Sequence, residues 1–218
     1  AKKDNTKKIT KQKKFNANNV IDAKDLPDLL YKLKGKKFII DNKSCSIFYE
    51  NIIKSKFKIS KKDDPIYKLK SIKNSHEINH MIEAHKKDGL ALTKFIYWIK
   101  YINKKIITEV EAQNKLEKFR KLNKKYLFPS FNTIAGSGSN GAIVHYRATN
   151  KTTKKIKKKD ILLVDSGGQY NYGTTDVTRT ICFSDQKPSI KNIYTNVLKG
   201  HIAVALTDLN KDDTGKKI

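Results

Sequence analysis

Two histidines with a glutamate between them form the most recognisable chemical motif in the sequence. His76, Glu77 and His80 have the H-E-x-x-H spacing, which on a helix can place both imidazoles on one zinc ion and leave the glutamate as a general base. The helical period tests this assignment, because the apolar positions of the segment must face the core. These positions are Ile78, Met81, Ile82, His85, Gly89, Leu92, Ile96 and Ile99. His76 and His80 lie on the opposite, solvated side, so no zinc site is predicted. His85 is expected to be a buried core histidine or one that supports a metal ligand, and not a ligand itself.

The longer zinc motif also lacks its third ligand here. It requires glycine at position 83 and histidine at position 86, whereas the chain has Glu83 and Lys86. A glutamate further along the chain is the remaining candidate for that ligand. The glutamates that follow are Glu109, Glu111 and Glu117, in a segment that ordinary helix capping and packing explain.

A glycine-rich segment at 136–141, Gly-Ser-Gly-Ser-Asn-Gly, matches the G-x-G-x-x-G spacing of dinucleotide-binding loops. That fingerprint needs a helix directly after the glycines, so that the helix N-terminus holds the pyrophosphate. The residues that follow, at 142–149, have strand-type composition instead. A glycine-rich turn between strands is therefore expected, which leaves room for a substrate to approach the backbone closely.

Asp165 and Asp176 are the strongest candidates for chemistry. Asp165 ends the apolar run 161–164, and Asp176 follows eleven residues later in a threonine-rich, strand-like run. If the two strands are antiparallel neighbours joined by the loop 166–173, both carboxylates meet at one end of the sheet. Two adjacent carboxylates repel unless a cation lies between them, and their hard oxygens suit manganese, cobalt, zinc or magnesium. The alternative is a pair of aspartates that only cap turns.

Helix caps and hydrophobic periods indicate the elements that position these residues. Short α/β elements are expected at 25–68, and a long helix capped by Asn74 or Ser75 at 74–101. Thr108 and Glu111 form a capping box that begins a second helix. The fold class is therefore α+β. Strands are expected at 131–138, 141–149, 160–168 and 174–183, with a lysine-rich hairpin loop at 151–159 and a last helix at 189–207.

The net charge of +26 would ordinarily indicate a nucleic acid or an anionic membrane as partner. Only three of the 47 basic residues are arginine, however, and the lysines are scattered along the chain. Specific base and phosphate recognition favours arginine forks, so no specific nucleic-acid partner is predicted. No run of 18 apolar residues, no signal-peptide pattern and only two distant cysteines occur, which predicts a cytoplasmic protein without a membrane partner.

Two longer segments surround the aspartates and carry a resemblance to a known family. They are FPSFNTIAGSGSNGAIVHYRAT at 128–149 and LLVDSGGQYNYGTTDVTRT at 162–180, with matching segments upstream from about residue 68. Together they resemble the Xaa-Pro aminopeptidase (aminopeptidase P) family. The resemblance implies a pita-bread fold of the creatinase/aminopeptidase type, with its N-terminal half at 69–218. It also implies that 1–68 is the C-terminal part of a creatinase-like N-terminal or middle domain.

The resemblance further implies roles for three residues. Asp165 and Asp176 match two of the five ligands of a two-metal centre, the first bound to one ion and the second bridging. His145 matches a catalytic and substrate-binding histidine near the scissile bond. The implied reaction is metal-assisted hydrolysis that releases an N-terminal residue preceding proline, with two manganese ions, or alternatively zinc or cobalt. Prolidase and methionine aminopeptidase are the rival relatives, and a homodimer is expected as in the family.

The sequence departs from the family at the other three metal ligands, which are a histidine and two glutamates. No glutamate follows Glu117, and the one histidine after Asp176 is His201, in an expected helix. We therefore expect a fragment, truncated at both ends, that binds metals weakly and cleaves nothing alone. It could complete its site with a separately encoded second half, or it could be a decayed, non-catalytic remnant. A basic nucleic-acid-binding module is the third alternative, which predicts tight, salt-dependent binding.

Overall fold

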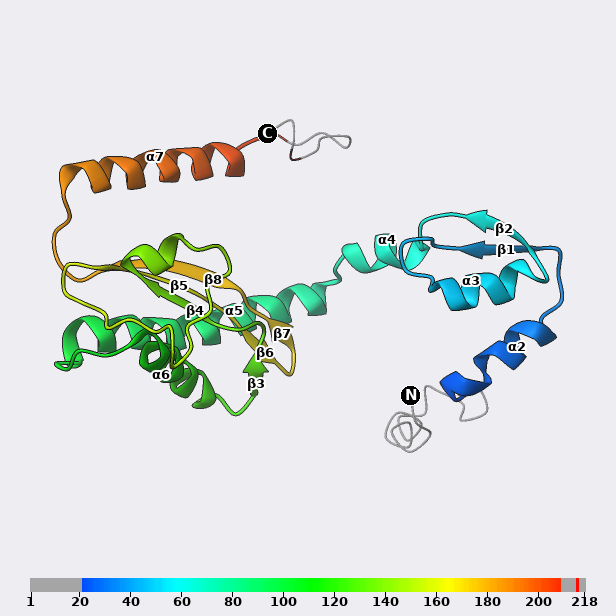
Figure 1. Ribbon diagram of the computed structural model, residues 1–218, viewed down its shortest axis with the longest axis horizontal. Coiled ribbons are helices and arrows are strands. Elements are labelled where there is room, and N and C mark those ends of the chain that lie inside the picture. The colour runs from blue at the N-terminus through cyan, green and yellow to red at the C-terminus, as the bar shows by residue number, and fades with distance from the viewer. Residues whose placement is uncertain (1–20, 209–214, 216–218) are drawn as a thin grey trace. The chain divides into compact units, whose positions relative to one another are not determined.

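Two compact units make up the chain in the computed structural model, which describes residues 21–208 and residue 215 (Figure 1). The division between the units falls at Lys73/Asn74, whereas the sequence places it between residues 68 and 69. The structural division is later because helix α4 (Pro65–Ser71) belongs with the first unit, and Asn74 caps the next helix. The first twenty residues of the predicted domain 1–68 lie outside the described part of the chain.

The first unit contains a small β-α-β arrangement besides α4. Its other elements are η2 (Ala23–Asp25), α2 (Leu26–Lys32), β1 (Lys37–Ile40), α3 (Ile47–Lys54) and β2 (Lys58–Lys61). The strands β1 and β2 pair in parallel, and α3 makes the crossover between them. Leu30, Ile40, Ile53 and Phe57 form the core of this unit. Strand β2 and helix α4 are not expected from the sequence, because both lie in a polar, lysine-rich stretch.

The helices of the second unit begin at the caps that the sequence indicates. Helix α5 (Ser75–Tyr97) starts with a capping box between Asn74 and Glu77, and it continues into a π-helical turn, η3 (Trp98–Ile102). Helix α6 (Glu109–Lys121) starts with the predicted box between Thr108 and Glu111. The two helices pack against each other beneath the strands (Figure 1).

Two three-stranded antiparallel sheets follow in the second unit, with orders β4-β5-β8 and β3-β6-β7. Their elements are β3 (Tyr126–Pro129), β4 (Ile134–Ser137), η4 (Gly138–Ala142), β5 (Ile161–Ser166), β6 (Gly168–Tyr170), β7 (Gly173–Thr174), β8 (Val177–Cys182) and α7 (Pro188–Ala205). The main core lies between the first sheet and the two helices. Its buried members are Leu92, Phe95, Ile99, Ala112, Leu116, Ala135, Ile156, Leu162, Val164 and Ile181.

The strand predicted at 141–149 is wrong. The glycine-rich segment continues from β4 into the 3-10 turn η4, and residues 143–149 have no regular structure. The expected hairpin at 151–159 is also wrong, because Ile156 N–H donates to the Ile107 carbonyl and Glu109 N–H donates to the Lys154 carbonyl. The lysine-rich segment therefore runs along the start of α6 instead of joining two strands.

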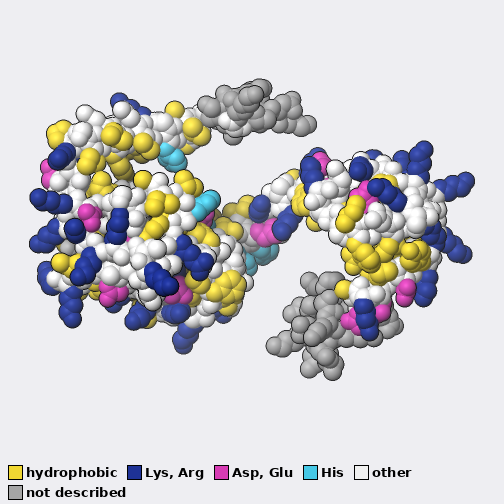
Figure 2. Space-filling model, viewed as in Figure 1, with side chains coloured by type: hydrophobic (Ala, Val, Ile, Leu, Met, Phe, Trp, Pro, Cys, Tyr) yellow, Lys and Arg dark blue, Asp and Glu magenta, His cyan; other side chains and the backbone are white. Residues whose placement is uncertain are grey.

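Helix α7 has little contact with the rest of its unit. None of its residues is buried, and its apolar side chains include Ile193 and Val197, which are 65% and 69% exposed. Figure 2 shows hydrophobic side chains along this helix and lysines spread over the visible surface of both units. Within the described residues, no helix has the length and apolar character needed to span a membrane.

Candidate metal centre

The antiparallel pairing of β5 and β8 brings Asp165, near the end of β5, and Asp176, directly before β8, to the same end of the sheet. Asp165 pairs with Thr178 in the register of the two strands. Asp176 lies two residues before Thr178 and one residue before the start of β8. The strand pairing that the sequence predicts is therefore present, with both aspartates where the connection between the strands begins and ends.

The surroundings of the two carboxylates suit a cation. Asp165 is half-buried and its Oδ1 accepts a 2.9 Å hydrogen bond from Thr178 Oγ1, while Asp176 is exposed. No lysine or arginine in the described part of the chain forms an ion pair with either one, despite the net charge of +26. Hard carboxylate oxygens without a counter-ion match the preferences of manganese and magnesium. The described residues hold no cluster of three or more histidine, cysteine, aspartate or glutamate side chains.

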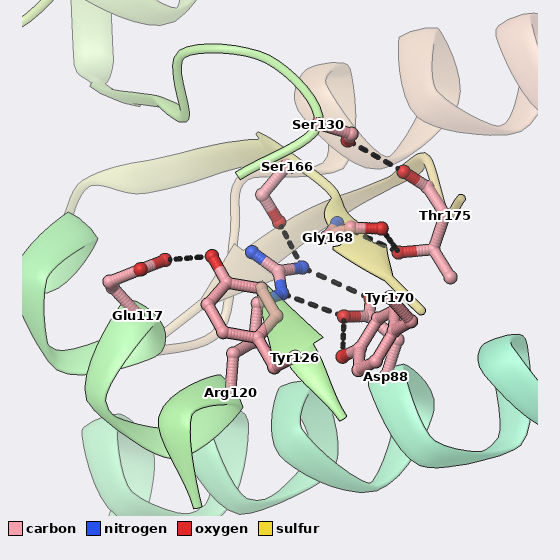
Figure 3. A network of polar contacts seen from close by, with 9 residues as sticks. All are labelled: Asp88, Glu117, Arg120, Tyr126, Ser130, Ser166, Gly168, Tyr170 and Thr175. Carbon is pink, nitrogen blue, oxygen red and sulfur yellow. Dashed lines mark hydrogen bonds and ion pairs between the residues drawn. The ribbon is translucent and has the colours of Figure 1, made fainter. Parts of the chain in front are cut away.

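The segment that joins the two aspartates is held by close backbone packing (Figure 3). Ser130 Oγ donates to the Thr175 carbonyl at 2.8 Å, and Gly168 N–H donates to Thr175 Oγ1 at 2.9 Å. A Cβ atom on Gly167 would overlap the Thr175 carbonyl oxygen and the Ser130 hydroxyl. Only glycine fits there, so the chain can pass from Asp165 to Asp176 in this tight path.

A buried ion pair lies directly beneath that segment (Figure 3). Arg120 Nε donates to Asp88 Oδ1 at 2.7 Å, and its Nη2 donates to Asp88 Oδ2 at 3.1 Å and to Ser166 Oγ at 3.0 Å. Tyr170 donates its hydroxyl to Asp88 Oδ1 at 2.8 Å. Arg120 Nη1 is buried with no hydrogen-bond partner in the described part of the chain. The pair thus ties α5 and α6 to Ser166, the residue next to Asp165.

Two tyrosines extend this network. Tyr126 donates its hydroxyl to Glu117 Oε2 at 2.6 Å, and its ring meets the Tyr170 ring edge-on at 5.5 Å. Burial raises the pKa of both phenols, and the hydrogen bonds to Glu117 and Asp88 raise the pKa values further. Both tyrosines stay neutral at physiological pH and act as hydrogen-bond donors to carboxylates.

His145 lies in an irregular, exposed segment and not in a strand. Its φ of 53° is in the left-handed region, and among the described residues it is the one non-glycine residue with positive φ. Such a conformation is uncommon for a residue with a Cβ and marks positions held by their surroundings. No hydrogen bond or ion pair in the described part of the chain joins His145 to Asp165 or Asp176.

The H-E-x-x-H motif lies on the surface, where the sequence analysis places His76 and His80. The His80 ring centroid is 6.0 Å from that of Tyr172. The expected burial of His85 is wrong, because its side chain is exposed and its Nδ1 is 2.9 Å from the Met81 carbonyl oxygen. Ile78, Met81 and Ile82 of the predicted apolar face are exposed too. In the first half of α5, the buried residues are instead Ala84 and Asp88.

Comparison with known proteins now identifies the family. The family model described as metallopeptidase family M24 matches residues 79–215, which include both aspartates and His145. The chain belongs to metallopeptidase family M24. Asp165 on β5 and Asp176 directly before β8 therefore lie in an M24 domain, and the resemblance to metallopeptidases inferred from the sequence is confirmed.

Curated relatives of this M24 chain are named Xaa-Pro aminopeptidases. It is 42% identical over 161 residues to the probable Xaa-Pro aminopeptidase P of Paracoccidioides brasiliensis, an alignment that covers 72% of this chain and 26% of the relative. It is 44% identical over 145 residues to the Xaa-Pro aminopeptidase ApepP of Drosophila melanogaster, an alignment that covers 66% of this chain and 24% of the relative. The chain thus spans about a quarter of the length of these relatives.

Solved structures of M24 proteins confirm the predicted fold class. The X-prolyl aminopeptidase of Caenorhabditis elegans, described as a cytosolic enzyme with a di-nuclear active site, matches with a TM-score of 0.62 and 33% identity over 70% of this chain and 25% of its own. The prolidase of Pyrococcus furiosus matches with a TM-score of 0.67 and 26% identity, and the match covers 83% of this chain and 51% of the prolidase. The α+β, pita-bread architecture is therefore shared over the part of each protein that the chain covers.

The sequence does not reveal that three charged residues near the candidate site are buried: Asp88, Glu109 and Arg120. Asp88 and Arg120 appear in the sequence as ordinary helix-surface residues, and Glu109 as a residue of the first helical turn. One signal does exist for Arg120, since it is one of only three arginines in a lysine-rich chain. A buried bidentate pair needs the planar guanidinium, which lysine cannot replace.

Proposed function

We propose that this chain supplies part of the two-metal centre of an Xaa-Pro aminopeptidase. Asp165 and Asp176 act as metal ligands, and His145 contacts the substrate near the scissile bond and steadies the charge that develops there. The observation that carries the proposal is the position of the two carboxylates at one end of the paired strands β5 and β8, in a chain whose relatives are named Xaa-Pro aminopeptidases. The reaction is hydrolysis of the bond between an N-terminal residue and proline.

The cofactors that we propose are two divalent cations, with manganese first and zinc or cobalt as alternatives. Asp165 and Asp176 would hold them, and Thr178 orients the Asp165 carboxylate through its 2.9 Å hydrogen bond. When bound, two such cations would polarise the substrate carbonyl and lower the pKa of a water molecule. The di-nuclear site named for the nematode relative supports two ions rather than one. The three further ligands expected in the family must come from other residues, because the described residues hold no group of three or more potential metal ligands.

The proposed substrates are peptides with proline at the second position. Because residues 1–218 carry two of the five ligands expected in the family, we propose that they cleave nothing without the three further ligands, which the second half of the catalytic domain would supply. A homodimer as in the family is the alternative assembly. We also propose a cytoplasmic location, which the description of the nematode relative as cytosolic supports.

Calorimetric titration with Mn²⁺ tests the metal ligands. We expect weak binding to the wild-type chain, and loss of that binding in Asp165→Asn and Asp176→Asn. The control Asp185→Asn removes an exposed aspartate that pairs with Lys191 in the same unit, and it should bind Mn²⁺ like the wild type. Equal binding by all four proteins would contradict the assignment of the ligands.

Peptidase assays test the activity. The pure chain is incubated with Mn²⁺ and either an Xaa-Pro dipeptide or an Xaa-Pro-Yaa tripeptide, because prolidase is also a structural relative. No release of the N-terminal residue is expected from either peptide. Co-expression with a polypeptide that carries the missing ligands should restore cleavage, in a way that depends on Asp165, Asp176 and His145. Cleavage by the chain alone would show that the proposed dependence on a second half is wrong.

A further inference from the structure

Glu109 is a fully buried carboxylate without a cationic partner in the described part of the chain. Its Oε1 accepts from Ser137 N–H at 2.7 Å and from the Asn140 side-chain amide at 3.0 Å. Its Oε2 accepts from the Tyr146 hydroxyl at 2.8 Å and from Lys154 N–H at 2.9 Å. A carboxylate has about four acceptor positions, and here each is matched by a donor.

These four donors come from chain segments that have little regular structure of their own. Ser137 ends β4, Asn140 lies in the turn η4, and Tyr146 and Lys154 lie in the irregular region that follows. Glu109 itself is the first residue of α6, where the helix dipole favours a negative charge. One side chain on a helix therefore contacts four separate positions between the end of β4 and Lys154.

Tyr146 carries this restraint to His145. Its side chain is buried and lies between Glu109 and Asn140, whose amide donates to the Tyr146 oxygen at 2.7 Å. Its backbone N–H donates to the Ile143 carbonyl at 3.2 Å, which closes a turn around His145. With Tyr146 fixed inward, the preceding residue takes the left-handed conformation and its imidazole is left exposed.

We infer that Glu109 is a positioning residue for His145, acting through the buried Tyr146 hydroxyl. The inference rests on the role proposed above for His145 at the substrate. Glu109 itself contacts neither the substrate nor the reacting atoms. It keeps the exposed imidazole in one orientation, because release of Tyr146 would let the 143–149 segment sample the more common negative-φ conformations. The carboxylate is specifically required, since all four groups that face it are donors.

Nuclear magnetic resonance of the full chain labelled with ¹³C and ¹⁵N tests the inference without metal or turnover. The His145 Cα and Cβ shifts and its one-bond Cα–Hα coupling report the positive φ, and its imidazole correlations report the ring environment. The variants are Glu109→Gln, whose amide group faces donors, and Tyr146→Phe, which removes only the connecting hydroxyl. His145→Gln assigns the ring signals among the five histidines.

In both test variants we expect loss of the positive-φ signature at His145 and a shift of its imidazole signals. The Tyr146 amide should exchange with solvent at least about tenfold faster, because its turn is no longer anchored. The imidazole signals of His80 and His201, on α5 and α7, should not move. Tyr146→Phe keeps the test decisive if Glu109→Gln does not fold.

Two control variants separate positioning from general loss of stability. Asp88→Asn disrupts the other buried network, and Glu111→Gln alters the exposed cap in the same helical turn as Glu109, so neither should change the His145 signature. Retention of that signature in Tyr146→Phe, or its equal loss in Asp88→Asn, overturns the inference. Failure of Mn²⁺ binding or of peptidase activity would count against the proposed function. The spectra are recorded without metal or substrate, so they test the positioning of His145 independently of that function.

Discussion

Replacement of Arg120 by lysine tests whether the buried ion pair beneath the candidate site needs a guanidinium. Arg120 is completely buried and its partner Asp88 is 1% exposed. Lysine keeps the positive charge but presents a single nitrogen, so it can replace at most one branch of the bidentate contact. The other Asp88 contact and the bond to Ser166 Oγ are lost together.

The size of the effect follows from those lost contacts. Each hydrogen bond to a charged group contributes about 1.5–3 kcal/mol. Lysine also removes Nη1, the buried nitrogen without a partner, which offsets about 1–3 kcal/mol of the loss. We therefore expect Arg120→Lys to lower the free energy of unfolding by about 3 kcal/mol, at the lower end of the roughly 3–5 kcal/mol that follows removal of a whole charged partner. In a unit of this size that corresponds to a fall of about 6–12 °C in Tm.

Tryptophan fluorescence during urea unfolding measures this change. The chain has one tryptophan, Trp98, which lies in the second unit against Phe95 and Lys115 and so reports unfolding of the unit that holds Arg120. The matched control is Arg147→Lys, because Arg147 is an exposed arginine in the same unit. The control should change the free energy of unfolding by no more than about 0.5 kcal/mol.

The reasoning is refuted if Arg120→Lys and Arg147→Lys lower the free energy of unfolding equally. It is also refuted if Arg120→Lys costs less than about 1 kcal/mol while the slope of unfolding against urea is unchanged. That result would mean that an ammonium group satisfies Asp88 and Ser166 as well as the guanidinium does. Ser166→Ala gives an independent measure, since it removes only the third contact and should cost about half as much.

Further predictions concern the backbone, the pH dependence and the exposed helix. Gly167→Ala should lower the free energy of unfolding by about 3 kcal/mol or more, because its Cβ would overlap backbone. The control Gly89→Ala, a helix position with open space around it, should raise that free energy by about 0.5–1 kcal/mol in the same urea assay. Burial and hydrogen bonding raise the pKa of Tyr126 and Tyr170, so the unfolded chain loses these protons first. Stability should therefore fall as pH rises above about 10, by at most about 1.4 kcal/mol per pH unit for each tyrosine, and Tyr170→Phe should reduce the slope. The chain should self-associate through α7, and Val197→Lys should lower the mass measured by light scattering.

Local signals explain the parts of the fold that the sequence predicts correctly. Both capping boxes, at Asn74 and Thr108, depend on residues within one turn, and both are present. The antiparallel pairing that brings Asp165 beside Asp176 follows from two strand-like runs and a short glycine-containing connection. The connection itself is richer than expected, because it forms the strands β6 and β7 of a second sheet.

Contacts between distant residues explain the parts that the sequence predicts wrongly. The run at 141–149 has strand-type composition, but Tyr146 is bound by Glu109, which lies 37 residues earlier in the chain. The apolar face assigned to the first half of α5 is exposed, because β7 packs on the side of Ala84, where a Cβ on Gly173 would come within 2.8 Å. A helical wheel cannot reveal that a small residue and a charged one are the buried positions.

Four acidic residues near the site divide into two chemical kinds. Asp88 and Glu109 are buried, and their oxygens are occupied by donors from Arg120, Tyr170 and the β4–β5 connection. Asp165 and Asp176 lie at one end of the sheet, and Asp165 accepts one hydrogen bond from a threonine hydroxyl. Neither aspartate forms an ion pair in the described part of the chain. Three donors bind Asp88 and at least four bind Glu109, so a metal ion at either acid would have to displace contacts that hold the fold. The second pair keeps more of its oxygen positions available, and the two buried acids restrain the segments next to it. This division of roles supports the proposal that Asp165 and Asp176, rather than Asp88 and Glu109, are metal ligands.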